Sequence, residues 1–278
     1  MRLFIQKNRR QDLAAKIAAA SFIKNGFNKE NISFLDFEES KLLKSFVGKK
    51  YLRSGKIKYF KDDLQSFTFL RFLAPEAAGY KGKILVIDPD VFAIKKIDDW
   101  DKFSMNDYNL ACTFLNNKPR SEVMIINAET VNWNFKDILE KVFKLQLDYS
   151  DLMNLSFDKK LRFKELKNSF NSLDKIEEDT ILLHTTDRIT QPWKEGLKID
   201  FEIHQPKYYI LKQYIKKYLG KKYDYKVASN VYLKHKDEKV ISIVKQYFKF
   251  AIENKLIKEN EIQESLKNNW ISPNFIKD

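Results

Sequence analysis

The chain has 278 residues, enough for one large domain or for one large and one small domain. Hydrophobic residues make up 44% of it and aromatic residues 14%, which excludes global disorder. Its single cysteine, Cys112, excludes an internal disulfide and a multi-cysteine metal site. The formal net charge of +13 favours an anionic partner such as nucleic acid, acidic lipid or a phosphorylated substrate.

The predicted elements alternate between strand and helix over the first 200 residues. In chain order we expect a strand at 2–6, a helix at 12–25 that ends at Gly26, a strand at 31–37, a basic loop, a buried helix at 64–73, strands at 83–87, 111–114 and 123–126, a helix at 135–145 and a strand at 180–183. This alternation predicts an α/β protein with a mixed, mostly parallel sheet flanked by helices.

Beyond Pro206 the pattern becomes helical and rich in lysine. We expect helices at 208–219, 238–253 and 259–268, and residues 201–278 contain 16 lysines against 9 acidic residues. The shift predicts a catalytic domain at 1–204 and a basic helical region at 205–278. Neither a secretory signal nor an apolar run of about 18 residues is recognisable, so we expect a cytoplasmic protein.

Two carboxylates follow the buried strand at 83–87, in the segment ILVIDPDVF. Asp88 and Asp90 are two positions apart, so in an extended segment both project from the same side. Because carboxylate oxygens are preferred ligands of Mg²⁺ and Mn²⁺, the pair can hold a divalent cation. The alternative interpretation is a turn, since Asp-Pro-Asp is also common turn chemistry.

A second polar segment, ILLHTTDRITQPWKEG, follows the last predicted strand of the first 200 residues. His184 can be a metal ligand or a hydrogen-bonded core histidine. Lys194 lies in a loop bounded by Trp193 and Gly196, where a lysine can bind a phosphate as a point charge.

Taken in order along the chain, these motifs resemble the GT-A fold nucleotide-sugar glycosyltransferases, family 8 and its bacterial family-8-like branch. The resemblance covers about residues 1–200. It rests on NRRQDLAAKIAAASFIKNGF, on LQSFTFLRFLAPEAAGYKGKILVIDPDVF with its DxD motif, on SEVMIINAETVNW, on FNSLD and on QPWKEG.

The resemblance implies a metal-dependent hexosyltransferase that moves a sugar from a nucleoside-diphosphate donor, expected to be a UDP-sugar, with retention of configuration. The acceptor would be a glycan or a lipid-linked glycan, as in polysaccharide biosynthesis. Mn²⁺ or Mg²⁺ would be held by Asp88, Asp90 and His184. The donor would contact Gln11, Arg71, Lys194 and Gly196.

The sequence departs from the family pattern in two places. Arg120-Ser121-Glu122 stands where the family has Asn-Ser-Gly, and only Asp151 and Asn154 remain of an Asp-Gln-Asp-x-x-Asn segment. Asp151 is therefore our candidate for the residue beside the reacting sugar, with a helix-surface aspartate as the alternative. These departures also motivate a second hypothesis, a non-catalytic basic binding protein on a glycosyltransferase-like scaffold. A nucleotidyltransferase is a third, although the chain lacks a glycine-rich phosphate loop.

The segment 207–222 contains six lysines and no acidic residue. A helix there would have a basic face and an aromatic-apolar face, which is typical of helices that lie on anionic membranes. Such contact would make the protein peripheral to the inner face of the membrane. The alternative is a helix packed on the catalytic domain with solvated lysines. Nucleic-acid binding is not expected, since no recognised nucleic-acid-binding motif accompanies the charge.

Overall fold

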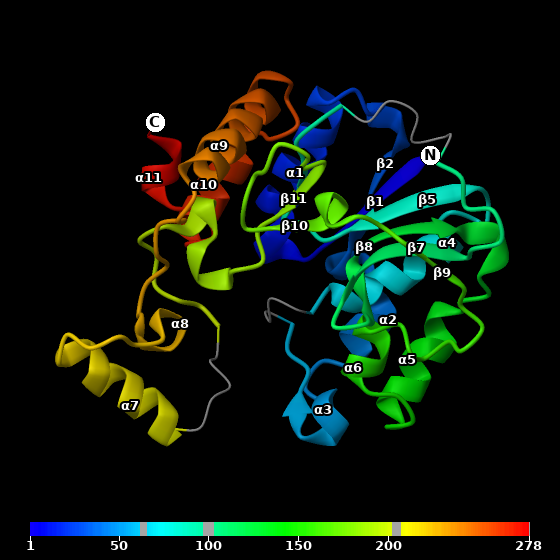
Figure 1. Cartoon of the computed structure of the whole chain (residues 1–278), viewed down its shortest axis with the longest axis horizontal. Helices are drawn as coiled ribbons and strands as arrows, with labels where there is room; N and C mark the ends of the chain where they lie inside the picture. The colour runs from blue at the N-terminus through cyan, green and yellow to red at the C-terminus, as the bar shows by residue number, and fades with distance from the viewer. Residues whose placement is uncertain (62–65, 97–102, 202–206, 278) are drawn as a thin grey trace.

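A computed structural model describes residues 1–61, 66–96, 103–201 and 207–277 of the chain (Figure 1). Its main sheet has six strands, in the order β2 (Ile32–Asp36), β1 (Arg2–Lys7), β5 (Lys83–Ile87), β8 (Lys118–Asn127), β7 (Leu110–Leu115) and β9 (Phe163–Glu165). Of these strands only β8 is antiparallel to its neighbours. The predicted mixed, mostly parallel sheet is therefore confirmed.

Two smaller sheets complete the strands. One contains β10 (Ser172–Leu173), β11 (Leu182–His184) and β6 (Val91–Ala93), and the other contains β3 (Lys50–Tyr51) and β4 (Ile57–Lys58). The helices of the described residues are α1 (Asp12–Lys24), α2 (Lys41–Ser45), α3 (Leu52–Gly55), α4 (Ala74–Ala77), α5 (Phe135–Phe143), α6 (Tyr149–Met153), α7 (Lys207–Tyr218), α8 (Tyr225–Ala228), α9 (Glu238–Glu253), α10 (Glu259–Lys267) and α11 (Pro273–Ile276).

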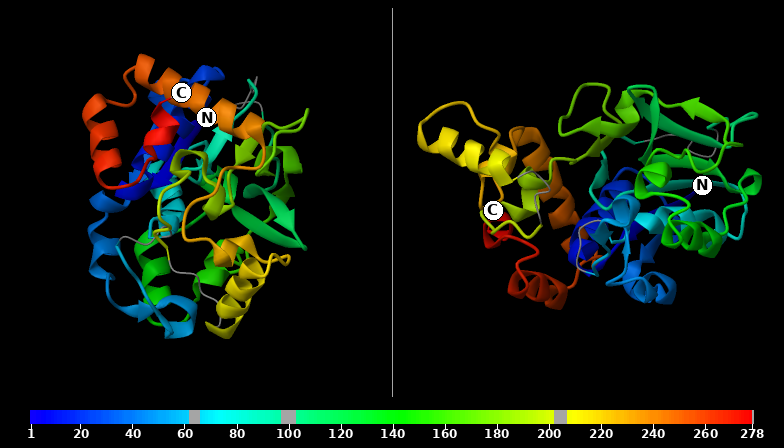
Figure 2. Two further views of the ribbon diagram at one scale, coloured as in Figure 1. Left: turned by 90° about the vertical axis from the view of Figure 1, so that its left-hand side faces the viewer. Right: turned by 90° about the horizontal axis from the view of Figure 1, so that it is seen from below.

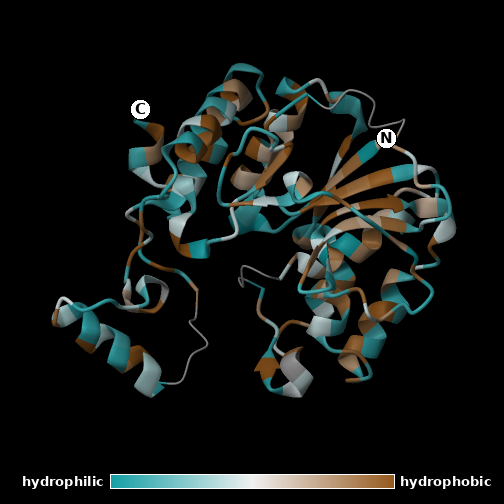
Figure 3. Ribbon diagram, viewed as in Figure 1, coloured by the Kyte–Doolittle hydropathy of each residue, from teal (hydrophilic) through white to brown (hydrophobic). Residues whose placement is uncertain are grey.

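The main sheet has a hydrophobic core on each face, because its side chains alternate between the two faces. Leu85 and Ile87 of β5 point into the core that contains α1 and α9, whereas Ile84 and Val86 point into the core that contains α5. The central strands are accordingly apolar on both sides, and Figure 3 shows them as the most hydrophobic part of the fold. Continuous apolar runs such as KILVI are typical of strands covered on both faces.

Helix α1 ends where the sequence predicts. Gly26 has φ +92°, and the N–H of Phe27 donates to the carbonyl of Phe22 at 2.9 Å. This is the Schellman arrangement, which requires a left-handed residue after the helix and so favours glycine.

Two local predictions need correction. Within the predicted helix at 64–73, residues 64 and 65 lie outside the described residues, and Thr68–Leu73 form a 3₁₀ helix that continues into α4. The expected basic loop after Phe37 instead contains α2, β3, α3 and β4. Pro75 stands in the first turn of α4, where a backbone N–H has no acceptor within the helix, so proline costs no hydrogen bond there.

The C-terminal helices have two different placements. Helix α9 packs along α1, and its Val244 and Phe248 belong to the same core as β1 and β5. Helices α7 and α8 lie away from the main sheet, as Figure 1 and the right view of Figure 2 show. The predicted domain boundary at 204/205 falls outside the described residues. Among the described residues, no helix has the length and apolar character needed to cross a bilayer.

Candidate metal centre and ligand cavity

The end of strand β5 carries the two predicted carboxylates, and strand pairing brings the predicted histidine beside them. Strand β6 begins at Val91, directly after Asp90, and runs antiparallel to β11 with Val91 opposite His184. The N–H of Thr185 then donates to the carbonyl of Asp90 at 3.1 Å. This pairing places residues almost a hundred positions apart on one site.

The three side chains converge on one point. One ligand atom each from Asp88, Asp90 and His184 lies within 4.8 Å of the others. Nε2 of His184 is 3.4 Å from Oδ1 of Asp90. Two carboxylates and an imidazole at this spacing could hold a divalent cation. His184 is buried with contacts to Asn171 and Asp90, which a hydrogen-bonded core histidine would also have.

Neighbouring side chains fix which atoms of the ligands face the site. Oδ1 of Asp88 accepts hydrogen bonds from Gln6 and, at 2.8 Å, from Arg71, so among the described residues its Oδ2 is the oxygen left for a ligand. Nδ1 of His184 lies 2.9 Å from Oδ1 of Asn171, whose Nδ2 donates to Oγ1 of Thr113. An amide oxygen accepts a hydrogen bond from a protonated Nδ1, which leaves Nε2 of His184 for a metal.

Three acids, Asp88, Asp90 and Glu122, gather at the site, where Arg71 pairs with Asp88 and Arg120 pairs with Glu122. Burial raises the pKa of Asp88 to about 6, and Asp90 adds to this effect while Arg71 opposes it. Burial would lower the pKa of His184, but Asp90, Asp88 and Glu122 outweigh it and raise that pKa. The pKa of Asp88 is thus raised mainly by burial, whereas the pKa of His184 is raised by the neighbouring acids.

A cavity of about 340 Å³ opens beside this cluster. Its size is within the usual range of small-molecule sites. The described lining residues are Gln11, Phe67, Thr68, Arg71, Asp88, Pro89, Asp90, Arg120, Glu122, Tyr149, Met153, His184, Thr186, Arg188 and Gln191. The structure therefore brings five of the predicted site residues to one cavity: Asp88, Asp90, His184, Arg71 and Gln11.

Lys194 and Gly196, also predicted for the donor, have other contacts. Lys194 is fully buried, and its Nζ lies 3.1 Å from Oδ2 of Asp200 and 3.3 Å from the hydroxyl of Tyr232. Gly196 has φ +84° and donates its N–H to the carbonyl of Tyr232. Neither is among the described residues that line the cavity.

Asp151 has a structural position as well. It is the third residue of α6, and its Oδ2 accepts the N–H of Asp148 at 2.7 Å in a capping box. Two other residues of the same helix, Tyr149 and Met153, line the cavity instead. The geometry thus presents α6 to the cavity through its first and last residues rather than through Asp151.

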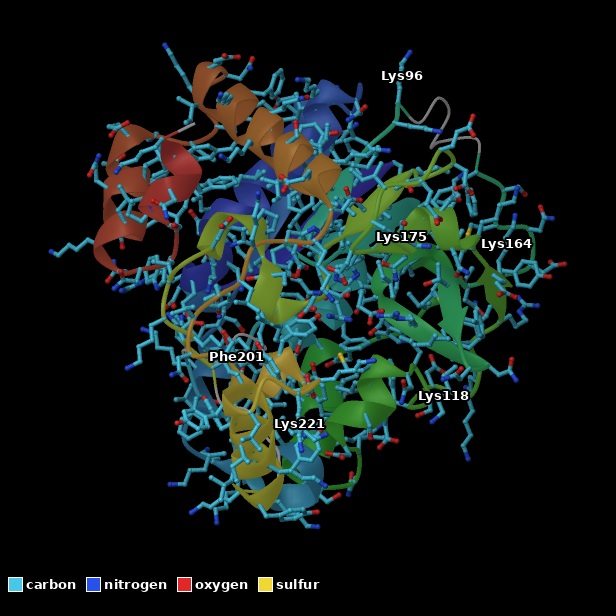
Figure 4. The ribbon with its side chains drawn as sticks, turned by 60° about the vertical axis from the view of Figure 1, so that its left-hand side comes forward. Lys96, Lys118, Lys164, Lys175, Phe201 and Lys221 are labelled. Atoms are coloured by element: carbon cyan, nitrogen blue, oxygen red, sulfur yellow. The ribbon has the colours of Figure 1, made fainter. Side chains whose placement is uncertain are left out.

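Three charged lining residues were not assigned a role from the sequence. Arg120 and Glu122 form a bidentate pair, with the shortest N–O distance 2.7 Å. Arg188 has no carboxylate partner among the described residues, and its guanidinium stacks 5.9 Å from the ring centroid of Phe201 (labelled in Figure 4). The sequence feature that could have pointed to Arg188 is its position as the single arginine in the loop after the His184 strand.

Two glutamines on the cavity lining have unused acceptors. Oε1 of Gln11 and Oε1 of Gln191 are buried and have no hydrogen-bond partner among the described residues. Buried polar atoms are rarely left without a partner, because each costs about 1–3 kcal/mol. A ligand with N–H or O–H donors would satisfy both.

Comparison with solved structures identifies the architecture. An active-site mutant of LgtC superposes with a TM-score of 0.50 at 15% identity, covering 72% of this chain and 91% of that one. This chain shares the fold of LgtC. The predicted GT-A-like fold is therefore confirmed.

Two further solved structures are similar. Galactosyltransferase LgtC in complex with donor and acceptor sugar analogs matches with a TM-score of 0.49 at 14% identity, over 70% of this chain and 90% of that one. The glycosyltransferase GlyE of Streptococcus pneumoniae matches with a TM-score of 0.48 at 16% identity, over 70% of this chain and 57% of that one. No protein-family model and no curated protein matches the sequence itself.

Proposed function

We propose that this protein is a metal-dependent glycosyltransferase that moves a sugar from a nucleoside-diphosphate donor, expected to be a UDP-sugar, to a glycan or lipid-linked acceptor. One observation carries the proposal: Asp88, Asp90 and His184 converge beside a cavity, at the end of a buried strand in a GT-A-like fold. Ligands of open α/β sheets bind at such strand ends.

The ligand set fits Mn²⁺ or Mg²⁺. Oδ2 of Asp88, a carboxylate oxygen of Asp90 and Nε2 of His184 would hold the ion, since carboxylate and imidazole ligands suit these divalent cations. When bound, the ion would neutralise charge on the diphosphate leaving group.

Other residues of the cavity would then bind different parts of the donor. Arg188, which has no carboxylate partner among the described residues, would bind a phosphate oxygen. Gln11 and Gln191 would accept hydrogen bonds from the nucleoside, through a ribose hydroxyl or a base N–H. Arg71 would act as a positioning residue, since its guanidinium is already bonded to Asp88 and to Ser121.

Turnover of UDP-sugars, followed as release of UDP with Mn²⁺ and with chelator, tests the proposal. Asp90→Asn and His184→Gln should lose roughly 100-fold or more of the wild-type rate, because each removes a metal ligand. Asp107→Asn, which changes an exposed acid that is not among the described lining residues, is the matched control and should keep full activity. Measurable turnover that chelator does not reduce, and that is equal in all four proteins, would overturn the proposal.

The ion pair between Arg120 and Glu122 supports one alternative, a binding protein that has kept the scaffold. These residues stand where the resembled family has Asn-Ser-Gly, and their pair occupies part of the cavity wall. Stabilisation by Mn²⁺ and UDP without turnover of any UDP-sugar would favour this alternative.

A further inference from the structure

Helix α7 carries a stripe of large apolar side chains that face away from the protein. Leu211 is 62% exposed, Ile215 50% and Tyr218 91%, and Tyr208 and Leu219 are exposed too. At 3.6 residues per turn, these five positions fall within an arc of roughly 100°. The stripe therefore covers one side of the helix along its whole length.

The opposite side of α7 holds the helix in this orientation. Oε1 of the buried Gln213 accepts the N–H of Asp224 at 3.0 Å, and the hydroxyl of Tyr214 donates to Asn230 at 2.6 Å. Nζ of Lys217 donates to the carbonyl of Ala228 at 3.0 Å. These contacts are specific and polar, so the apolar side faces outward as a consequence of the fold. The helix lies at the periphery in Figure 1 and in both views of Figure 2.

Lysines border the stripe on both sides. Lys207 lies at one edge, and Lys212 and Lys216 lie at the other, while Lys221 (labelled in Figure 4) follows the helix. The segment 207–222 contains no acidic residue. An apolar stripe between two basic edges is the pattern of a helix that lies in the interface of an anionic membrane.

We propose that α7 docks on the surface of an anionic lipid bilayer, with its apolar stripe in the interface and its lysines on lipid phosphates. A second copy of the chain fits this surface less well, because a symmetric contact would bring like charges together. The stripe's aromatic residues at 208 and 218 match the headgroup level, where tyrosine is favoured.

The docking helix is connected to the candidate site. Tyr225 of α8 donates its hydroxyl to Oδ2 of Asp187 at 2.7 Å, and the next residue, Arg188, lines the cavity. Docking would therefore hold the cavity near lipid headgroups. The membrane proposal goes beyond the proposed function and does not depend on it, since it is tested without donor or metal.

Sedimentation with phosphatidylcholine vesicles, with or without phosphatidylglycerol, tests the proposal on the full chain. Wild-type protein should bind the anionic vesicles and bind the neutral ones weakly. Lys212→Gln with Lys216→Gln should weaken binding to anionic vesicles by roughly 30-fold. Leu211→Ser with Ile215→Ser should abolish measurable binding. Three of these residues are exposed and Lys216 is partly exposed, so circular dichroism should be unchanged.

The matched control changes two lysines of the α5 region, Lys136→Gln with Lys144→Gln, which are exposed on another part of the molecule. It should bind like wild type. Equal binding to both vesicle types, no binding, or insensitivity to the α7 substitutions would overturn the proposal. So would a concentration-dependent dimer, measured by sedimentation velocity, that the Leu211 and Ile215 substitutions dissociate, because the occupant would then be a second copy.

Discussion

Replacing Asn171 by leucine tests how the histidine of the site is oriented. Asn171 is 5% exposed and accepts from Nδ1 of His184 at 2.9 Å, so it keeps Nε2 turned toward Asp90. Removing such a partner of a metal-binding histidine typically weakens metal binding by 10–100-fold, or about 1.4–2.8 kcal/mol. We expect a loss of that size for Mn²⁺ in Asn171→Leu.

Two further variants separate this role from a general loss of structure. Asn171→Asp keeps an acceptor for Nδ1 and should retain Mn²⁺ affinity, while Asn168→Leu changes an exposed asparagine of the same segment and should have no effect. Leucine at 171 also leaves buried partners unpaired, at about 1–3 kcal/mol of unfolding free energy. Calorimetric titration gives the affinity and urea denaturation the stability. A folded Asn171→Leu protein with wild-type Mn²⁺ affinity would refute the reasoning.

Three other predictions concern the packing around the site. Lys194→Met should lower the free energy of unfolding in urea by about 3–5 kcal/mol, because it removes a fully buried partner of Asp200. Unchanged stability with lost nucleotide binding would assign Lys194 to the donor instead. Burial would raise the pKa of Asp200, but Lys194, Tyr232 and Arg10 outweigh it and hold that pKa below the ordinary 3.8. The ionised carboxylate therefore stabilises the fold above pH 3.8, and this stabilisation is lost as the pH falls through the lowered pKa. Asp200→Asn should therefore reduce the difference in stability between neutral and strongly acidic pH, and equal acid sensitivity would contradict this. Phe248→Ala should lower the free energy of unfolding by about 3–5 kcal/mol, and the whole protein should still unfold in a single transition. A separate unfolding transition for α9 would contradict a shared core.

Much of the fold could be predicted from the sequence, because local pattern is enough for its central elements. The strand at 83–87 is continuously apolar, and the helix at 12–25 has helical spacing and a glycine at its end. The structure confirms both, as β5 and α1. The α/β alternation followed from elements of this kind.

The geometry of the site depended on elements that local pattern does not reveal. Strand β6 has three residues, too few for a periodic signal, yet its pairing with β11 brings His184 to Asp90. The spacing of Asp88 and Asp90 pointed to a cation and the resemblance added His184, but no local pattern reveals the strand pairing that joins them. Lys194 illustrates the reverse case, since its loop suggested a phosphate ligand, but its Nζ contacts Asp200, six residues further on, and Tyr232, which is distant in the sequence.

The most direct test of the account is to locate Mn²⁺ in a crystal of the protein soaked with Mn²⁺ and UDP, from the anomalous scattering of the metal. The account predicts one strong peak at coordinating distance, about 2.1 Å, from Asp88, Asp90 and His184 together. A Mn²⁺ peak elsewhere, with the three side chains coordinating nothing while UDP is bound, would contradict it.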